Sequence, residues 1–96
     1  MNITMTNAEF DALADYLNAR FADRVKAVGS TYTQRQMTRE IGGDISEETL
    51  RRLMNRKVKK RGLDIRTLTA LVRAFGPEVL DVLGIPHSGR GTFFGE

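Results

Sequence analysis

The chain has 96 residues, of which 41% are hydrophobic and 28% charged, and its formal net charge at pH 7 is +3. A chain of this length forms one domain, no stretch approaches the roughly 20 apolar residues of a membrane-spanning helix, and the first residues lack the basic and apolar regions of a signal peptide. The absence of cysteine excludes disulfides and thiolate metal sites and agrees with the reducing cytoplasm. We therefore expect a single cytoplasmic domain.

The first expected helix covers residues 7–27 and ends at Gly29. Thr6 and Glu9 have the spacing of a capping box, in which each side chain accepts a hydrogen bond from the other residue's backbone N–H. Met5 before it and Phe10 after it form a hydrophobic staple. Apolar residues then recur at steps of three and four, which predicts one buried stripe: Phe10, Leu13, Ala14, Leu17, Phe21, Val25 and Val28.

Residues 33–55 predict two short capped helices joined by a glycine turn. Thr33 to Gln36 repeats the capping box and opens the first of them. Gly42-Gly43 ends it, because glycine reaches the left-handed conformation without a Cβ clash. Ser46 caps the next helix. The inward residues expected from helical spacing are Met37, Ile41, Leu50, Leu53 and Met54, the last either in the core or over the edge of the motif, with the core favoured.

Two more helices are expected after a basic loop, over residues 63–76 and 77–84. Asp64 caps the first, and Gly76-Pro77 ends it and places proline at the first position of the second. No segment alternates at period two, so no strand is expected. The staple recurs as Tyr32/Met37, Ile45/Leu50 and Leu63/Leu68, and the remaining predicted core residues are Leu71, Val72, Phe75, Leu80 and Leu83.

These features together resemble the lambda-repressor/Cro-like (XRE-type) helix-turn-helix family over roughly residues 30–84. The resemblance implies a compact all-α bundle of about five helices with a central helix-turn-helix that binds double-stranded DNA. Residues 1–84 would then form the DNA-binding domain, and 85–96 a C-terminal tail. The residues that carry it are Thr33-Gln34, Met37, Ile41, the glycine turn, Ile45-Ser46, Leu50, Leu53 and Asn55.

The positive charge is concentrated in residues 51–66, which carry eight arginines and lysines against Asp64 alone. Because the whole chain has a net charge of +3, the rest of it is net −4. A one-sided cluster of this kind is the footprint expected for a polyanion. The alternative is a solvated loop that happens to be basic, but its place after a helix-turn-helix favours nucleic acid.

The resemblance assigns roles to residues of the motif. Gln34 and Asn55 match family residues that hold the phosphate backbone. The candidates for base edges are Glu47, Glu48, Arg51 and Arg52, with Arg51 preferred because arginine pairs bidentately with guanine. Non-specific phosphate contacts are expected from Arg56, Lys57, Lys59, Lys60 and Arg61.

Glu47 and Glu48 depart from the glutamine or serine that is frequent at these positions of the family. A carboxylate is repelled by phosphates, yet it accepts a hydrogen bond from cytosine N4 in the major groove. Three interpretations stay open: the two residues specify cytosine, they reject wrong sites, or this helix does not bind DNA in the usual way. As residues of a first helical turn they also interact favourably with the helix dipole.

No catalytic or metal-binding motif is present, so we expect neither an enzyme nor a cofactor. His87 is the only histidine and lies in the tail. In the same tail, Phe93 and Phe94 either pack on the domain, pack on a second subunit or belong to a disordered end.

The sequence thus predicts a bacterial or phage transcriptional regulator, a repressor, that binds double-stranded DNA sequence-specifically and forms a homodimer on a palindromic site. One rival is a helical protein-interaction module, such as an antitoxin-like or phage protein that binds a host factor, without specific DNA binding. The other is an RNA-binding protein that uses the basic loop alone.

Overall fold

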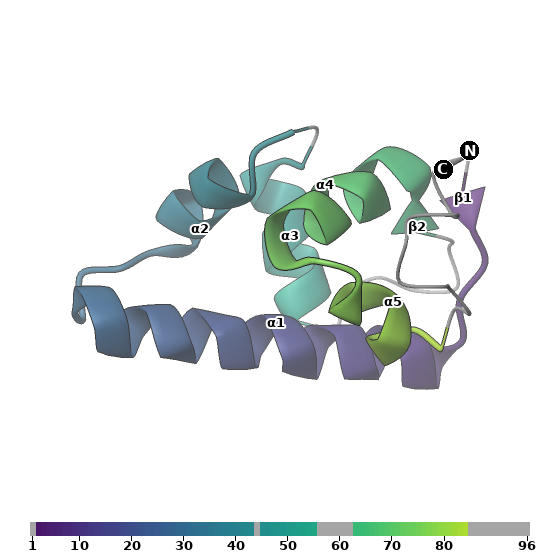
Figure 1. Ribbon diagram of the computed structural model, residues 1–96, viewed down its shortest axis with the longest axis horizontal. Coiled ribbons are helices and arrows are strands. Elements are labelled where there is room, and N and C mark those ends of the chain that lie inside the picture. Colours follow the sequence, from purple (N-terminus) through teal and green to yellow (C-terminus); the bar gives the residue numbers. More distant parts are fainter. Residues whose placement is uncertain (1, 44, 56–62, 85–96) are drawn as a thin grey trace.

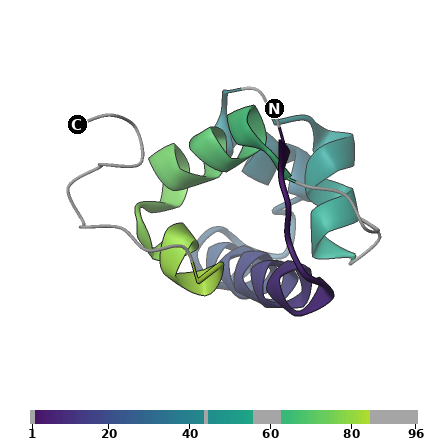
Figure 2. The same cartoon turned by 90° about the vertical axis from the view of Figure 1, so that its right-hand side faces the viewer.

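The longest helix, α1 (Asn7–Val28), lies beneath the other helices in Figure 1. The computed structural model describes residues 2–43, 45–55 and 63–84. The other helices of this part are α2 (Gln34–Ile41), α3 (Glu47–Met54), α4 (Ile65–Phe75) and α5 (Glu78–Val82). Figure 2 views α1 nearly end-on and shows α3 and α4 on opposite sides of the bundle above it. The predicted all-α bundle of five helices is confirmed.

The four predicted helix starts are confirmed as capped ends. Thr6 and Thr33 each form a complete capping box, with Glu9 and Gln36 respectively. The Ser46 hydroxyl accepts from the Thr49 backbone N–H at 3.1 Å, and an Asp64 carboxylate oxygen accepts from that of Arg66 at 2.9 Å. Local capping chemistry therefore sets where α1, α2, α3 and α4 begin, because each cap satisfies an N–H that the helix leaves unpaired.

The expectation of no strand is wrong. Strand β1 (Asn2–Ile3) pairs antiparallel with β2 (Leu63–Asp64), with Asn2 opposite Asp64 and Ile3 opposite Leu63. Strands of two residues are too short to show an alternation of period two, so the sequence pattern gave no signal for them. The pair ties the beginning of the chain to the start of α4.

The core forms where the apolar stripe of α1 meets the inner faces of the other helices. Side chains that are fully or almost fully buried come from every helix. Met54 is buried, as favoured from the sequence. The predicted core residues Val72 and Phe75 are only partly buried and pack against the cluster. Its most completely buried members are Leu13, Leu17, Met37, Leu50, Leu68, Leu71, Val79 and Leu83.

Val28 does not belong to this core, contrary to the prediction from the stripe. It is 47% exposed. Figure 1 shows the last turn of α1 extending past the helices above it, so the apolar pattern continues beyond the other helices of the described residues. Val25 and Phe21, about one and two turns earlier, are partly buried against the core.

The turn between α2 and α3 depends on glycine. Gly42 and Gly43 both have positive φ, of 70° and 66°, a conformation that costs a residue with a Cβ free energy. Gly43 also lies against α4, because a Cβ added to it would be 3.0 Å from the Cβ of Ala70. The two glycines therefore allow a tight turn between α2 and α3, and Gly43 allows this turn to pack closely against α4.

Candidate nucleic-acid interface

Helix α3 has two chemically distinct faces. Its inner face places Leu50, Leu53 and Met54 in the core, with exposed fractions of 0%, 3% and 5%. The four residues predicted to read bases are all exposed: Glu47, Glu48, Arg51 and Arg52. The structure thus places all four residues on the solvent side of one helix, and their proposed role as base-reading residues stays a prediction.

Glu48 lies between the two arginines of this face. One of its carboxylate oxygens accepts from Nη2 of Arg51 at 2.6 Å, and the other accepts from Nε of Arg52 at 2.9 Å. The spacings of three and four residues put both arginines over the glutamate on the helix surface. The two guanidinium groups, that of Arg51 first, hold the pKa of the Glu48 carboxyl below its ordinary value. The carboxylate in turn raises the pKa of Arg51.

Glu47 has a different partner. Its carboxylate lies 3.4 Å from Nε of Arg35, which belongs to α2. The two glutamates of the first turn thus act in different directions: Glu47 links α3 to α2, whereas Glu48 pairs within α3. All three ion pairs are exposed, and water screens pairs of this kind, so they contribute little to stability.

The residues matched to phosphate contacts lie at the two ends of the α2–α3 pair. Gln34 begins α2 and is half-buried, with its side-chain nitrogen 3.7 Å from Sδ of Met54. Asn55 follows α3, is exposed, and donates its backbone N–H to the carbonyl of Arg51 at 3.0 Å. Their positions bring the start of α2 next to the end of α3. The five residues of the basic segment, Arg56, Lys57, Lys59, Lys60 and Arg61, lie outside the described residues.

Asn18 was not predicted from the sequence, yet it holds α3 in place. From α1, its side-chain nitrogen donates to the carbonyl of Met54 at 2.9 Å and to that of Ala14 at 2.8 Å. A last-turn carbonyl of α3, which the helix itself leaves unpaired, thereby gains a donor from α1. The one available signal was an asparagine inside a helix, where this residue is disfavoured unless its amide has a specific partner.

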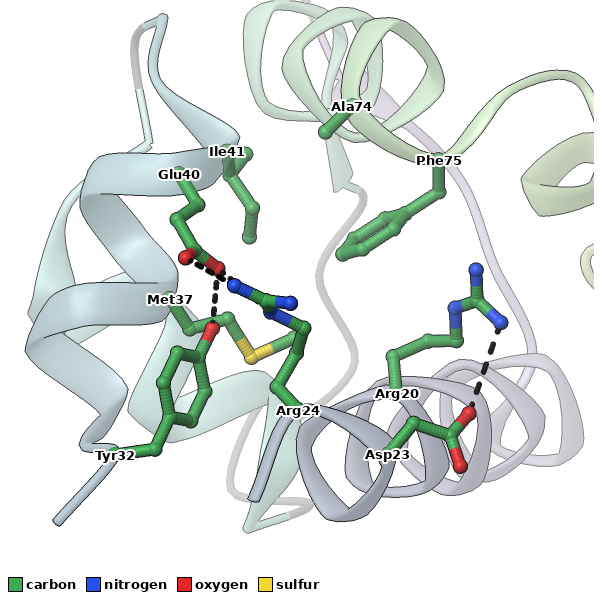
Figure 3. Close-up of a pocket in the computed structure, with 9 residues that line it drawn as sticks. All are labelled: Arg20, Asp23, Arg24, Tyr32, Met37, Glu40, Ile41, Ala74 and Phe75. Carbon is green, nitrogen blue, oxygen red and sulfur yellow. Dashed lines mark hydrogen bonds and ion pairs between the residues drawn. The ribbon is translucent and has the colours of Figure 1, made fainter. Parts of the chain in front are cut away.

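A second polar cluster braces α2 against α1 (Figure 3). Arg24 of α1 meets the Glu40 carboxylate of α2 through Nη2 at 2.8 Å, and the Tyr32 hydroxyl donates to the same carboxylate at 2.6 Å. The guanidinium also lies 5.5 Å from the centre of the Tyr32 ring, an arrangement that adds cation–π attraction. This cluster was not foreseen, because it depends on which helices become neighbours.

The charges and the phenol of this brace perturb one another. Arg24, followed by the Tyr32 hydroxyl, lowers the pKa of Glu40 below its ordinary value. Burial, followed by the hydrogen bond to Glu40, raises the pKa of Tyr32 to about 12. Each effect favours the form that makes the bonds in the structure, a charged carboxylate and a neutral phenol.

The brace lines a cleft of about 300 Å³ between α1, α2 and the end of α4. Its polar rim balances two arginines with two acids, since Arg20 lies 3.8 Å from Asp23 and Arg24 is paired with Glu40. Phe75 and Met37 contribute apolar walls. Because the charges at the rim cancel, the cleft lacks the surplus charge that would select a polyanion.

No group of three or more His, Cys, Asp or Glu residues that could hold a metal ion occurs in residues 2–43, 45–55 and 63–84. Within the same ranges, every helix is too short or too polar to cross a membrane. Comparison of the chain with protein-family models, with curated proteins and with solved structures finds no significant match.

Proposed function

We propose that this protein binds double-stranded DNA sequence-specifically, with α3 as the helix that enters the major groove. The observation that carries the proposal is the division of α3 into a buried apolar face and an exposed face with four charged side chains. Arginine and glutamate are residue types that read base edges in the major groove, arginine at guanine and glutamate at cytosine.

Support also comes from the way α3 is held. A reading helix has to keep its angle to the rest of the domain while its outer face stays free. Here the inner face is packed in the core, the end is bonded to Asn18, and the start is capped by Ser46 and linked to α2 through Glu47. These contacts leave the exposed face of α3 uncovered within the described part of the chain.

The basic segment would add affinity that does not depend on sequence. It follows α3 directly in the chain, so its arginines and lysines are tethered next to the reading helix. Lysine and arginine neutralise phosphates and release condensed counterions, which supplies most of non-specific binding. Base contacts by α3 and phosphate contacts by this segment are complementary parts of one interface.

By the resemblance to lambda-repressor-like proteins, we propose a transcriptional regulator of bacterial or phage origin, a repressor, that binds as a homodimer. Two copies related by a twofold axis would place their α3 helices about 34–36 Å apart on a palindromic site. Sedimentation velocity with and without the selected duplex would measure the copies bound per site.

One observation favours the rival, a helical protein-interaction module. The charges on the exposed face of α3 are already paired, with Glu48 on two arginines and Glu47 on Arg35. A face that neutralises itself attracts phosphates less than a face with free cations does. If the protein is such an interaction module, its basic segment would bind an acidic protein partner.

The deciding experiment is the selection of bound sequences from a random duplex pool, followed by salt-dependent binding to duplex DNA and RNA. Enrichment of a defined motif supports the proposal. Arg51→Ala should weaken binding to the enriched motif much more than Arg73→Ala, a matched loss of one exposed charge on α4. Equal affinity for DNA and RNA with no enriched motif would contradict it.

A further inference from the structure

The arginines on the exposed face of α3 share one counter-ion that is built into the helix. Glu48 uses both carboxylate oxygens, one for Arg51 at 2.6 Å and one for Arg52 at 2.9 Å. This arrangement places a carboxylate where a DNA phosphate or a base edge would otherwise meet the same donors. Any DNA contact by these arginines therefore competes with Glu48.

We propose, resting on the function proposed above, that Glu48 is a specificity-determining residue which acts as an internal competitor for DNA phosphate at Arg51 and Arg52. The competing groups are chemically alike, since a carboxylate and a phosphate both offer two anionic oxygens to a guanidinium. When an arginine exchanges the Glu48 carboxylate for a DNA phosphate, the binding free energy therefore gains little. The freed carboxylate would also be left next to the phosphates, which repel it.

A cognate base edge changes this balance. Guanine presents O6 and N7 as a neutral pair of acceptors that one guanidinium meets with two hydrogen bonds, at a distance from the strand phosphates. The released Glu48 carboxylate can accept from a cytosine N4 amino group, so it too gains a partner on a suitable sequence. Wrong sequences offer neither compensation. Glu48 thereby raises the cost of non-specific binding more than the cost of cognate binding, which is specificity gained by penalising competitors.

Glu47 provides the matched control, because it is the adjacent residue, carries the same charge and is also exposed. It differs in its partner, since its carboxylate lies 3.4 Å from Arg35 of α2. Replacing Glu47 removes one negative charge from the face but leaves the pairs of Glu48 intact. A comparison of Glu48→Gln with Glu47→Gln therefore separates the competitor role from the general effect of charge.

The first measurement needs no DNA. Exchange with water of the side-chain Nε–H of Arg52 is followed by ¹⁵N NMR in the intact chain. It should be several-fold slower in the wild type and in Glu47→Gln than in Glu48→Gln, because only the last variant loses the carboxylate acceptor. Equal exchange in the three proteins would overturn the proposal, since Glu48 would then not hold Arg52, one of the two arginines for which it is proposed to compete.

The second measurement compares affinity for a random duplex with affinity for the selected duplex at one salt concentration. Glu48→Gln should tighten random binding roughly four- to ninefold, from two released arginines at about two- to threefold each, and should lower the selected-to-random ratio. Glu47→Gln removes a candidate contact to cytosine but releases neither Arg51 nor Arg52, so it should lower this ratio less than Glu48→Gln does. The same ratio in the two variants would overturn the proposal. If no duplex bound any of the proteins, the proposed function itself would fail, and the role of Glu48 with it.

Discussion

A substitution at the glycine turn tests whether α4 restrains the direction in which α3 leaves α2. In Gly43→Ala, the new Cβ would lie 3.0 Å from the Cβ of Ala70 and 3.7 Å from its Cα. The backbone there has a φ of +66°. The left-handed conformation costs roughly 1–2 kcal/mol and the close contact about 1–3 kcal/mol, so the free energy of unfolding should fall by about 2–5 kcal/mol.

The contact can be separated from the backbone strain by a double-mutant cycle. Ala70→Gly removes the methyl group that the new side chain would meet, at a cost of about 1 kcal/mol for glycine inside a helix. In the background of Gly43→Ala the same change also relieves the close contact, so it should be about 1–3 kcal/mol less costly than it is in the wild type. Gly42→Ala is the matched control: its φ is also positive, at +70°, but the nearest atom to its Cβ is the Arg39 carbonyl oxygen at 3.9 Å.

Urea denaturation followed by circular dichroism measures all the members of both cycles. The expected coupling with Ala70→Gly appears for Gly43→Ala and is absent for Gly42→Ala. Additive losses in both cycles, within about 0.5 kcal/mol, would refute the reasoning. They would mean that the turn has room to move away from α4, and that glycine is needed there for its backbone alone.

Three further predictions concern charge and ionisation. Burial, aided by nearby Glu78 and Glu40, raises the pKa of Tyr16 and Tyr32 to about 12, so the stability that their neutral forms contribute is retained below the ordinary pKa of 10 and lost as the pH rises from 10 towards 12. The chain has two tyrosines and no tryptophan, so absorbance at 295 nm should show no phenolate in the folded protein near pH 10. A tyrosine that titrates there in the folded protein would contradict this prediction. Arg51→Ala should cost about 1–3 kcal/mol of binding free energy on the selected duplex and relax the base preference at one base pair. Equal losses on scrambled DNA would show that Arg51 contacts phosphate. Alanine should replace four residues of the basic segment together: Lys57, Lys59, Lys60 and Arg61. Binding to all duplexes should weaken alike, and the log–log slope of affinity against salt should flatten by about 0.9 for each phosphate that is no longer neutralised. An unchanged slope would show that the segment does not contact the DNA backbone.

The parts of the fold that could be predicted from the sequence are those that depend on near neighbours in the chain. Capping boxes at Thr6 and Thr33 join residues three positions apart, so the pattern contains both partners. The inner faces of α2 and α3 follow from helical spacing for the same reason. The prediction that Val28 is buried is wrong, because the apolar stripe of α1 carries no information about where the covering helices end, and Val28 lies beyond them.

The candidate site divides in the same way. Exposure of Arg51 and Arg52 follows from the helical period, and their pairing with Glu48 is implicit in spacings of three and four. The bond from Asn18 to Met54 joins residues 36 positions apart, and the ion pair between Arg35 and Glu47 joins different helices. Such contacts become visible only when the arrangement of the helices is known.

The pairing of β1 with β2 has a consequence for the order in which the molecule forms and opens. The ladder joins Asn2 to Asp64 and Ile3 to Leu63, so its closure has to restrict a long intervening loop for the return of very few hydrogen bonds. Contacts among α1, α2 and α3 are more local and should form before it. In the native state, the ladder should exchange its amide hydrogens earlier than the core helices do. Its opening would free the beginning of the chain from the start of α4 while the bundle stayed folded.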